Sequence, residues 1–433
     1  MSSLTRAPYD QREMLTLSLI RRLARSLPFA ALGLATAAAV VIVIVTVTVT
    51  VTVGATTQAP PSLNDTIADA TSGERFSLGR FEAEHVLSSL FVEVGAFVRG
   101  QSGQRYRGLD GDRRVLERYF TLSAEIDVLQ RFAGPDTGVL ADLRAQRQLF
   151  ENRVERVLQR RIADSFRSAG LSRPLPLFSA QEILWPPVAV ELSRMPRVLA
   201  VSPRDEIRLL RTCLLSPDLS DTQVREIEAA VEADGRFSAF VDRIGGVATY
   251  PAIVVDTRSY RATVSVAAHE WVHHYLFFFP LGASFFDNDE LRTINETVAD
   301  IVGDEIAALI ITAFPDVDVP APAPMDRLDS DALLNQLRQD VDALLVEGRV
   351  ADAEALMGKA RLELADEHDR LFRRINQAFF AFNGVYGDRP QSSSPIGPLL
   401  RELRVRSDSL SNFVAVVREV DSLEALQALA ATP

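Results

Sequence analysis

The sequence predicts an α+β fold with a small mixed sheet and a mainly helical C-terminal half, and three observations support this fold class. Helical periodicity runs through residues 76–170 and returns after residue 290. Short β-branched runs separate these helical parts, between residues 188 and 256. The chain has 433 residues, of which 47% are hydrophobic and 24% charged, so it is large and apolar enough for two or three domains with a substantial core.

The charge and the cysteine content exclude several classes of protein. A net charge of −12 argues against nucleic-acid binding, which usually needs a basic face. The single cysteine, Cys213, rules out an intramolecular disulfide framework and a four-cysteine zinc site. We therefore expect no nucleic-acid partner and no fold that depends on disulfides.

The N-terminal part of the chain has the pattern of a membrane anchor. Residues 1–28 form a short basic tail, and residues 29–53 follow without a charge. At a rise of 1.5 Å per residue, a helix of this length crosses the hydrocarbon core of a bilayer. Arginines precede the run and none follow it closely, which predicts a cytoplasmic N-terminus and an extracytoplasmic remainder. The competing interpretations are a cleaved signal peptide and a soluble strand with Val-Thr alternation.

The part of the chain after the expected anchor begins with a linker and continues as helices. Residues 54–75 are largely polar and contain a Pro-Pro pair, which is typical of a linker. Residues 76–170 are predicted as a helix pair or a small bundle. Its amphipathic segments lie at 80–99, 113–131 and 143–166.

Residues 171–433 are expected to form the domain that carries the functional residues. Two β-branched runs at 188–192 and 197–201 predict an antiparallel pair of strands. A helix over 220–234, capped by its first or second residue, precedes another strand at 252–256. Further helices are predicted at 263–279, 291–312, 328–346, 351–382 and 397–430.

A zinc-binding motif stands in the helix predicted at 263–279. His269 and His273 are four residues apart, so both imidazoles lie on one face of the helix and can reach one ion. Glu270 lies beside the open coordination position. There its carboxylate can take a proton from a metal-bound water and pass it to a leaving amine.

Catalytic zinc usually has three protein ligands, so a third one must be found. The long motif with a third histidine is excluded, because Leu276 and Phe279 stand where it needs glycine and histidine. Glu296 follows His273 by 23 residues and is the better candidate. Asp300 follows it by one helical turn and could accept the other ring N–H of a zinc-bound histidine.

Chance is the competing explanation for the first motif, because H-E-x-x-H also occurs in proteins that bind no metal. A histidine on an apolar helix is then a core residue with satisfied hydrogen bonds. However, three of the 5 histidines fall within residues 269–274, and Glu296 and Asp300 follow at motif spacing. We therefore predict a Zn²⁺ site.

The two motifs together resemble those of the gluzincins, the thermolysin-like and aminopeptidase-N-like zinc metallopeptidases. His269–His273 is similar to their first motif, and Asn295–Asp300 is similar to their N-E-x-x-x-D motif. The resemblance covers about residues 264–304 and implies a zincin-like domain that hydrolyses peptide bonds. The segment between the two motifs is slightly longer than in thermolysin-type enzymes, so we expect a different connection there.

The resemblance also implies a role for each residue of the motifs. His269, His273 and Glu296 would be the zinc ligands, and Glu270 the general base and acid. Asp300 would support the site from outside the ligand set, as the partner of His269. Asn295 is counted with Asp300 in this supporting role.

Two further features of the family are expected here. In the family, the strand before the zinc helix is a sheet edge that pairs with the extended substrate, which points to the strand at 252–256. A Tyr or His near the C-terminus often donates a hydrogen bond to the oxyanion. Tyr386, at a Gly-bounded turn, is our preferred catalytic residue for this role, and His368 is the alternative.

The sequence therefore predicts a membrane-anchored, extracytoplasmic zinc peptidase with a peptide or protein substrate. Residues 29–53 would contact the lipid bilayer. Residues 245–249 lie where aminopeptidases carry a G-x-M-E-N-like motif but lack its Glu and Asn, and the choice between endo- and exopeptidase stays open. The alternatives are a non-catalytic envelope scaffold or peptide-binding protein with a structural zinc, and a membrane regulator whose 76–170 helices bind a partner.

Overall fold

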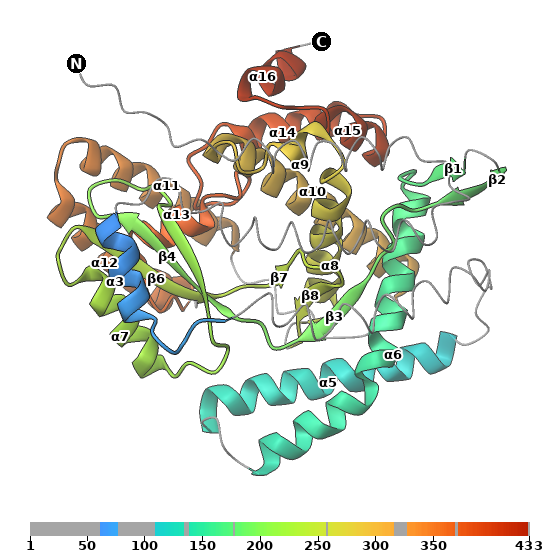
Figure 1. The fold of residues 1–433 in the computed structure, drawn as a ribbon, viewed down its shortest axis with the longest axis horizontal. Helices are drawn as coiled ribbons and strands as arrows, with labels where there is room; N and C mark the ends of the chain where they lie inside the picture. Colours follow the sequence, from blue (N-terminus) through green and yellow to red (C-terminus); the bar gives the residue numbers. More distant parts are fainter. Residues whose placement is uncertain are drawn as a thin grey trace.

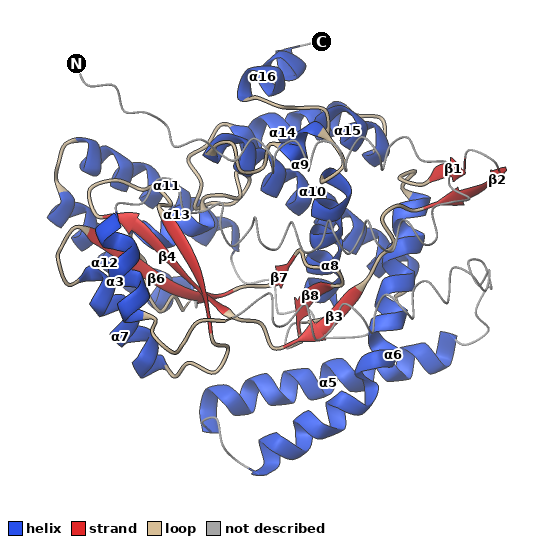
Figure 2. Cartoon of the chain, in the orientation of Figure 1, coloured by secondary structure: helices blue, strands red, loops and turns tan. Residues whose placement is uncertain are grey.

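The computed structural model describes residues 61–76, 109–133, 138–175, 178–256, 259–315, 327–368 and 371–431. These residues form a mainly helical α+β protein with three small sheets, which confirms the predicted fold class (Figure 2). The predicted tail and membrane span at 1–53 lie outside the described residues, as does the predicted helix at 80–99. Within the described ranges, no helix has both the length and the apolar character needed to cross a membrane.

The helices of these described residues vary widely in length. They are α3 (Pro61–Ala70), α5 (Leu109–Ala133), α6 (Gly138–Ser168), α7 (Asp221–Glu232), α8 (Tyr260–Leu276), α9 (Pro280–Ala283), α10 (Asp289–Ala313), α11 (Arg327–Val346), α12 (Val350–His368), α13 (Gln377–Asn383), α14 (Ile396–Arg406), α15 (Leu410–Val417) and α16 (Leu423–Ala431). The strands are β1 (Arg173–Leu175), β2 (Phe178–Ile183), β3 (Val190–Ser193), β4 (Arg197–Pro203), β5 (Arg211–Leu215), β6 (Phe237–Arg243), β7 (Gly246–Val247) and β8 (Ala252–Val255).

Two long helices, α8 and α10, pack against each other in the middle of the molecule (Figure 1). Apolar residues on α8 such as Val264 and Trp271 are buried against residues of α10 such as Val298 in one large core. This core also includes residues of α5, α6 and α14–α16. The helices approach closely because α10 has Gly303 at their contact, where a Cβ would lie 2.8 Å from the carbonyl oxygen of Ser265.

The sheet next to α8 has the order β3-β8-β7 and is mixed. β3 pairs with β8 in parallel, Val190 opposite Ala252, and β7 pairs with β8 antiparallel. The predicted antiparallel pair of 188–192 with 197–201 is therefore wrong. Both runs are strands, but they belong to different sheets, because the chain between them crosses from one sheet to the next instead of forming a hairpin.

The expectation that the strand at 252–256 forms a sheet edge is also wrong. β8 lies in the middle of its sheet, between β3 and β7. The edge of this sheet on the antiparallel side is the short strand β7, which follows directly after Gly245. A two-residue strand has too little alternating pattern to be read from the sequence.

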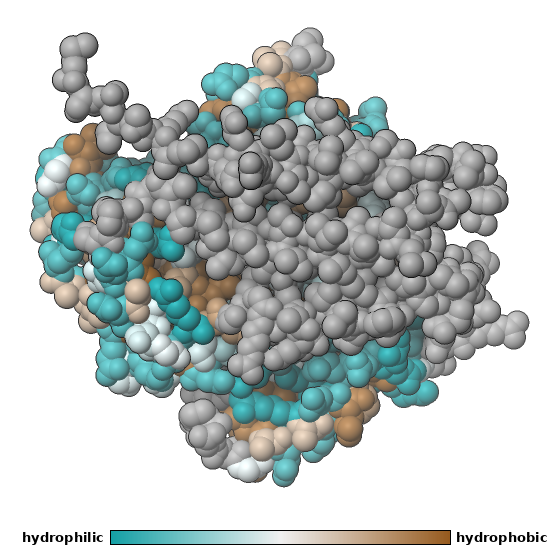
Figure 3. Space-filling view, in the orientation of Figure 1, coloured by the Kyte–Doolittle hydropathy of each residue, from teal (hydrophilic) through white to brown (hydrophobic). Residues whose placement is uncertain are grey.

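The second three-stranded sheet, β5-β4-β6, lies between two layers of helices (Figure 1). One face packs on α3 and α7 through buried residues such as Leu199, Val201 and Val241. The other face presents Phe240 to α11–α13, where it contacts Phe379 edge-to-face at 5.4 Å between ring centroids. On the outside, the surface over α7 and α12 is mostly hydrophilic, as expected for covering helices (Figure 3).

Helix α3 lies inside the segment that was predicted as a linker. Pro61 is its first residue, which suits a position whose N–H needs no helical partner. Leu63 and Ile67 are one turn apart and are both buried against the core of α7 and the β5-β4-β6 sheet. The linker prediction is therefore wrong for residues 61–70, because two apolar side chains at helical spacing outweigh the polar composition around them.

Other local predictions had mixed outcomes. The helix at 220–234 is confirmed as α7, with Ser220 as its N-cap in a complete capping box. The single helix predicted over 351–382 is wrong, since α12 ends at His368 and α13 starts at Gln377. Asn376 caps α13 by accepting a hydrogen bond from the backbone N–H of Phe379, and this cap begins a second, separate helix.

We predict that Ile67→Ala destabilises the whole fold. The substitution leaves a cavity in the core around α7, and such truncations lower the free energy of unfolding by about 2–5 kcal/mol. Urea unfolding of the purified protein measures the change. The matched control is Asp69→Ala, which alters an exposed side chain of the same helix. Equal midpoints for both variants would contradict a packed α3.

Candidate metal centre

Two histidines on α8 direct their rings to the same point. The helix starts at its N-cap Ser259 and brings His269 and His273 onto one face, a turn apart. Their ring centroids are 4.7 Å apart, and their Nε2 atoms are 3.0 Å apart. The remainder of the helix is largely buried, so this face is a polar site within an apolar element.

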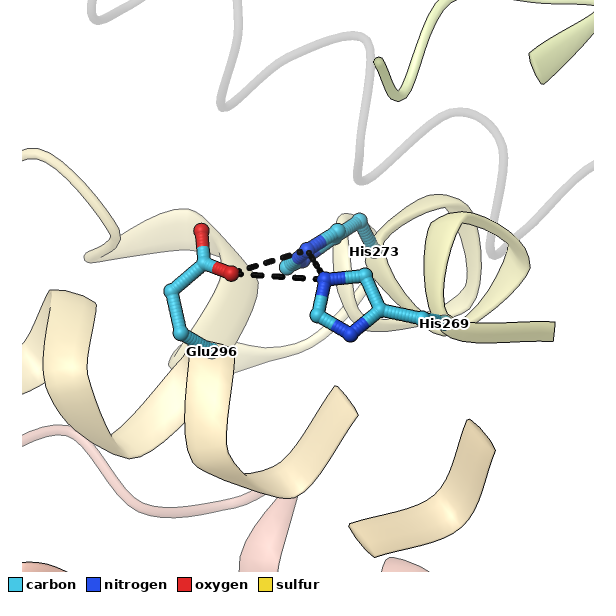
Figure 4. Close-up of side chains that lie close together, drawn as sticks. All are labelled: His269, His273 and Glu296. Carbon is cyan, nitrogen blue, oxygen red and sulfur yellow. Dashed lines mark hydrogen bonds and ion pairs between the residues drawn. The ribbon is translucent and has the colours of Figure 1, made fainter. Parts of the chain in front are cut away.

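Glu296 completes the group from the neighbouring helix α10 (Figure 4). Its Oε2 lies 3.3 Å from Nε2 of His269 and 3.5 Å from Nε2 of His273. Four ligands at about 2.0–2.1 Å from a tetrahedral zinc are roughly 3.3 Å from one another. The three candidate ligand atoms therefore have the mutual spacing that a zinc ion requires.

Each histidine is oriented by a hydrogen bond at its other ring nitrogen. Nδ1 of His269 is 2.9 Å from Oδ1 of Asp300, and Nδ1 of His273 is 2.8 Å from Oδ1 of Asn295. The Asn295 amide donates its own N–H to the carbonyl oxygen of Leu281, which makes Oδ1 the acceptor for the histidine. Asp300 thus lies behind His269, as the resemblance implied, and Asn295 lies behind His273, a partner that the sequence had not indicated.

These hydrogen bonds imply that the centre needs a cation. An imidazole that donates through Nδ1 has an unprotonated Nε2. Two such Nε2 lone pairs and the Glu296 carboxylate then face one another within 3.5 Å. Three acceptors this close repel one another unless a proton or a metal ion lies between them. The chemistry of the donor set therefore fits a divalent metal with imidazole and carboxylate ligands.

The pKa shifts of the central groups favour their ionised forms, an anionic glutamate beside a protonated histidine. Burial opposes ionisation of Glu296, but the charge of His273 and the hydrogen bond from His269 outweigh it and hold the pKa of Glu296 low. Burial also disfavours a charged His269, but its hydrogen bonds to Asp300 and Glu296 raise its pKa well above the ordinary value. Without a metal, the cluster thus holds a proton where the ion would bind.

Arg389 is part of the centre and was missed in the sequence. Its guanidinium donates to Oδ2 of Asp300 from Nε at 2.9 Å and from Nη2 at 2.8 Å. Arg389, Asp300 and His269 thus form a chain of hydrogen bonds, in which the arginine compensates the charge of the partly buried carboxylate. The only available signal was its place three residues after Tyr386, since the motif spacing says nothing about the loop that follows α13.

Glu270 is buried next to the histidines, on the side of α8 that faces β7. Gly246 of β7 approaches it so closely that a Cβ there would lie 2.3 Å from Oε1 of Glu270. Burial raises the pKa of this carboxyl group, while His269 and His273 act in the opposite direction. A glutamate with a raised pKa is suited to take and return a proton near neutral pH.

Tyr386 also reaches the centre. The centroid of its ring is 6.1 Å from that of His269, and the guanidinium of Arg389 lies 3.8 Å from its ring centroid. Burial, followed by the charge of Glu296, raises the pKa of Tyr386 well above its ordinary value, so the phenol keeps its proton. The alternative, His368, is the last residue of α12, and its side chain lies outside the described part of the structure.

His274, the third histidine of α8, does not belong to the metal-binding group and points toward Tyr250. Its ring packs edge-on against Tyr250 at 5.6 Å between centroids. Burial, with a smaller contribution from His273, lowers its pKa to about 4. His274 is therefore neutral at pH 7 and belongs to the packing between α8 and the loop before β8, outside the ligand set.

Comparison with known proteins adds no relative to this description. No protein family model matches the chain, and searches of curated proteins and of solved structures also find no match. The assignment of the centre therefore depends on its own geometry and charges.

We predict about one zinc ion per chain in the gently purified protein and much less in Glu296→Ala. Removing the carboxylate leaves two ligands, too few for a stable zinc site. Metal content by inductively coupled plasma mass spectrometry is the measurement. Glu290→Ala, an exposed glutamate in the first turn of the same helix, is the control and should keep its zinc. Full occupancy in Glu296→Ala would refute the three-ligand site.

Proposed function

We propose that this protein is a zinc-dependent peptidase. His269, His273 and Glu296 hold the ion, and Glu270 acts as general base and acid. The observation that carries the proposal is the convergence of three acceptor atoms within 3.5 Å, with the buried Glu270 beside them on the helix of the two histidines. A catalytic zinc has three protein ligands and an open position, and this donor set has that number within the described residues.

A zinc ion bound there would lower the pKa of a water and polarise the substrate carbonyl. In the proposed reaction, Glu270 takes a proton from the attacking water and then delivers it to the nitrogen of the leaving amine. Its raised pKa suits both transfers. The hydrogen bonds from His269 to Asp300 and from His273 to Asn295 hold the imidazoles in one orientation throughout.

Tyr386 is proposed to stabilise the oxyanion that develops on the scissile carbonyl. Its ring is near His269, and its raised pKa keeps the phenol protonated and able to donate a hydrogen bond. Arg389 stacks on this ring and also holds Asp300, so it positions both groups. It is a positioning residue in this proposal.

The substrate is proposed to bind as an extended peptide along β7. This strand is the edge of its sheet and passes Glu270 through Gly246. Peptides commonly add a strand to such an edge through main-chain hydrogen bonds. In this proposal the substrate pairs with β7 and not with the strand at 252–256, which lies in the middle of the sheet.

The anchoring of the enzyme remains part of the proposal. Residues 29–53 are proposed to hold the protein in the membrane, with the catalytic part outside the cytoplasm. This part of the proposal is supported by the uncharged run and by the arginines that precede it.

Glu270→Gln should abolish hydrolysis and keep the zinc. An amide cannot accept the proton of the attacking water, and the loss of a general base lowers the rate by about 10²–10⁴-fold. Peptide-library digestion followed by mass spectrometry measures activity, with Glu290→Gln as the control. Unchanged cleavage would exclude Glu270 as the base. Absence of any cleavage by the zinc-loaded wild type would favour a scaffold with a structural zinc.

Tyr386→Phe should lower kcat by about 10²–10³-fold with little change in KM, as expected when one oxyanion donor is lost. The substitution keeps the ring that packs on Arg389 and removes only the hydroxyl. Steady-state kinetics on a peptide identified from the library separates the two parameters. An unchanged kcat would remove Tyr386 from the mechanism.

Gly246→Ala should lower activity by about tenfold to a hundredfold without loss of zinc. The new Cβ would lie 2.3 Å from Oε1 of Glu270 and 2.7 Å from Cγ1 of Val266, so the carboxylate must move. A displacement of about 1 Å at a catalytic group can have an effect of this size. Gly358→Ala is the control, because nothing lies within 4 Å of its Cβ position. Equal activity of both variants would contradict the close contact of β7 with Glu270.

A further inference from the structure

A small pocket lined by arginines lies where the core around α8 and α10 meets the β5-β4-β6 sheet. It is formed where α6, the β3–β4 connection and the ends of β6 and β8 meet, just before α8 begins. The two histidine ligands lie in the other half of α8 and Glu296 lies on α10, and none of the three lines the pocket, so the pocket is separate from the metal centre. Its charged lining residues are Arg144, Arg147, Arg194, Arg197, Arg243 and Asp256.

The lining carries a large excess of positive charge. Among the described lining residues, Asp256 is the only carboxylate, and it is held by Arg147, which donates to both its side chain and its backbone carbonyl. Arg194 pairs with Asp218, which lies outside the lining. Three arginines are left without a carboxylate partner among the described residues, in a chain whose net charge is −12.

Two of these arginines are forced together by the sheet. Arg197 and Arg243 stand directly opposite each other in the antiparallel pair β4–β6. Like charges at opposite positions of such a pair destabilise it. Arg197 is only 7% exposed, and its one hydrogen bond to a described residue goes from Nη2 to the carbonyl oxygen of Leu219 at 2.7 Å. Burial, followed by the charge of Arg243, lowers its pKa.

The third arginine without a carboxylate partner approaches from α6. Arg144 is half-buried, one turn before Arg147, and forms no hydrogen bond or ion pair with a described residue. Burial, followed by the charges of Arg194 and Arg147, lowers its pKa. Carboxylates among the described residues, such as Asp256 near Arg144 and Asp221 near Arg197, offset this repulsion only in part, so an anion among Arg144, Arg197 and Arg243 would reduce it further.

A larger pocket near α7 and α12 also contains arginines, but there each arginine has a carboxylate partner. It has a volume of about 380 Å³ and is lined by Arg204 and Arg374, among others. Both arginines there are fully paired, Arg204 with Glu354 and Arg374 with Glu232. That pocket has no unbalanced charge, whereas the arginine pocket does.

We propose that the arginine pocket binds a phosphoryl group, either as free phosphate or as part of a small phosphomonoester. Guanidinium groups match the tetrahedral oxyanion through paired N–H donors. The pocket has a volume of about 70 Å³. A single water needs about 10–15 Å³, so there is room for roughly five heavy atoms, the number in a phosphate.

Binding at this place would join the two parts of the fold. Arg144 belongs to α6, in the core of α8 and α10, while Arg197 and Arg243 belong to the β5-β4-β6 sheet. A phosphoryl group held by all three would act as a bridge between them. It would stabilise the folded state in proportion to its concentration, since ligand binding to the native state shifts the unfolding equilibrium.

Isothermal titration calorimetry with inorganic phosphate tests the proposal on the full-length protein at constant ionic strength. We expect saturable binding that weakens at least tenfold in the double variant Arg144→Gln/Arg243→Gln. Arg225→Gln, an exposed arginine of α7, should bind as the wild type does. Glu296→Ala should also retain binding, which separates this pocket from any phosphate bound at the metal centre.

Two further measurements complete the test. Phosphoserine replaces phosphate in a parallel titration. Binding of both ligands supports a phosphomonoester as the occupant, and binding of phosphate alone supports the free anion. Thermal unfolding in chloride should show that the double variant is folded and no less stable than the wild type, because the two arginines it replaces have no carboxylate partner within the described ranges. Non-saturable heats, or equal phosphate affinity in the wild type and the double variant, would overturn the proposal.

Discussion

The close packing of α8 on α10 is the contact on which the rest of this structure depends. The histidines belong to one helix and Glu296 to the other, so a shift of either helix by a few ångströms would separate the three acceptor atoms. Gly303 makes the approach possible, because any Cβ there would meet the backbone and side chain of α8 near His269. A buried apolar seam thus determines the geometry of a polar centre.

The histidines and Asp300 are tolerated in their largely desolvated positions because each has a specific partner. Asp300 is shared by His269 and Arg389, and Asn295 connects His273 to the carbonyl of Leu281. Isolated charges would be strongly destabilising in such surroundings. What remains uncompensated is the set of acceptors at the middle of the cluster, which a proton or a metal ion can satisfy. The arginine pocket shows the opposite imbalance, because it has an excess of cationic donors that an anion could satisfy.

Local rules explain why some of the fold and much of the candidate site could be predicted. His269 and His273 are four residues apart, so one helix is enough to bring both onto one face. A second helix does the same for Glu296 and Asp300. Ser220 satisfies the backbone of α7 within a few residues of itself. Apolar periodicity identified α5 and α6 for the same reason, because amphipathic helices record their buried face in consecutive residues.

The sequence by itself determined where most of the long helices form and which residues could share a metal, because both depend on neighbours in the chain. Only the tertiary structure decided the partners of the strands, since β3 reaches β8 across about 60 residues. It also brought Arg389 to Asp300, Gly246 to Glu270 and Arg243 to Arg197. Such contacts join segments that lie far apart in the chain, and the energy of packing them together is not recorded in any local pattern.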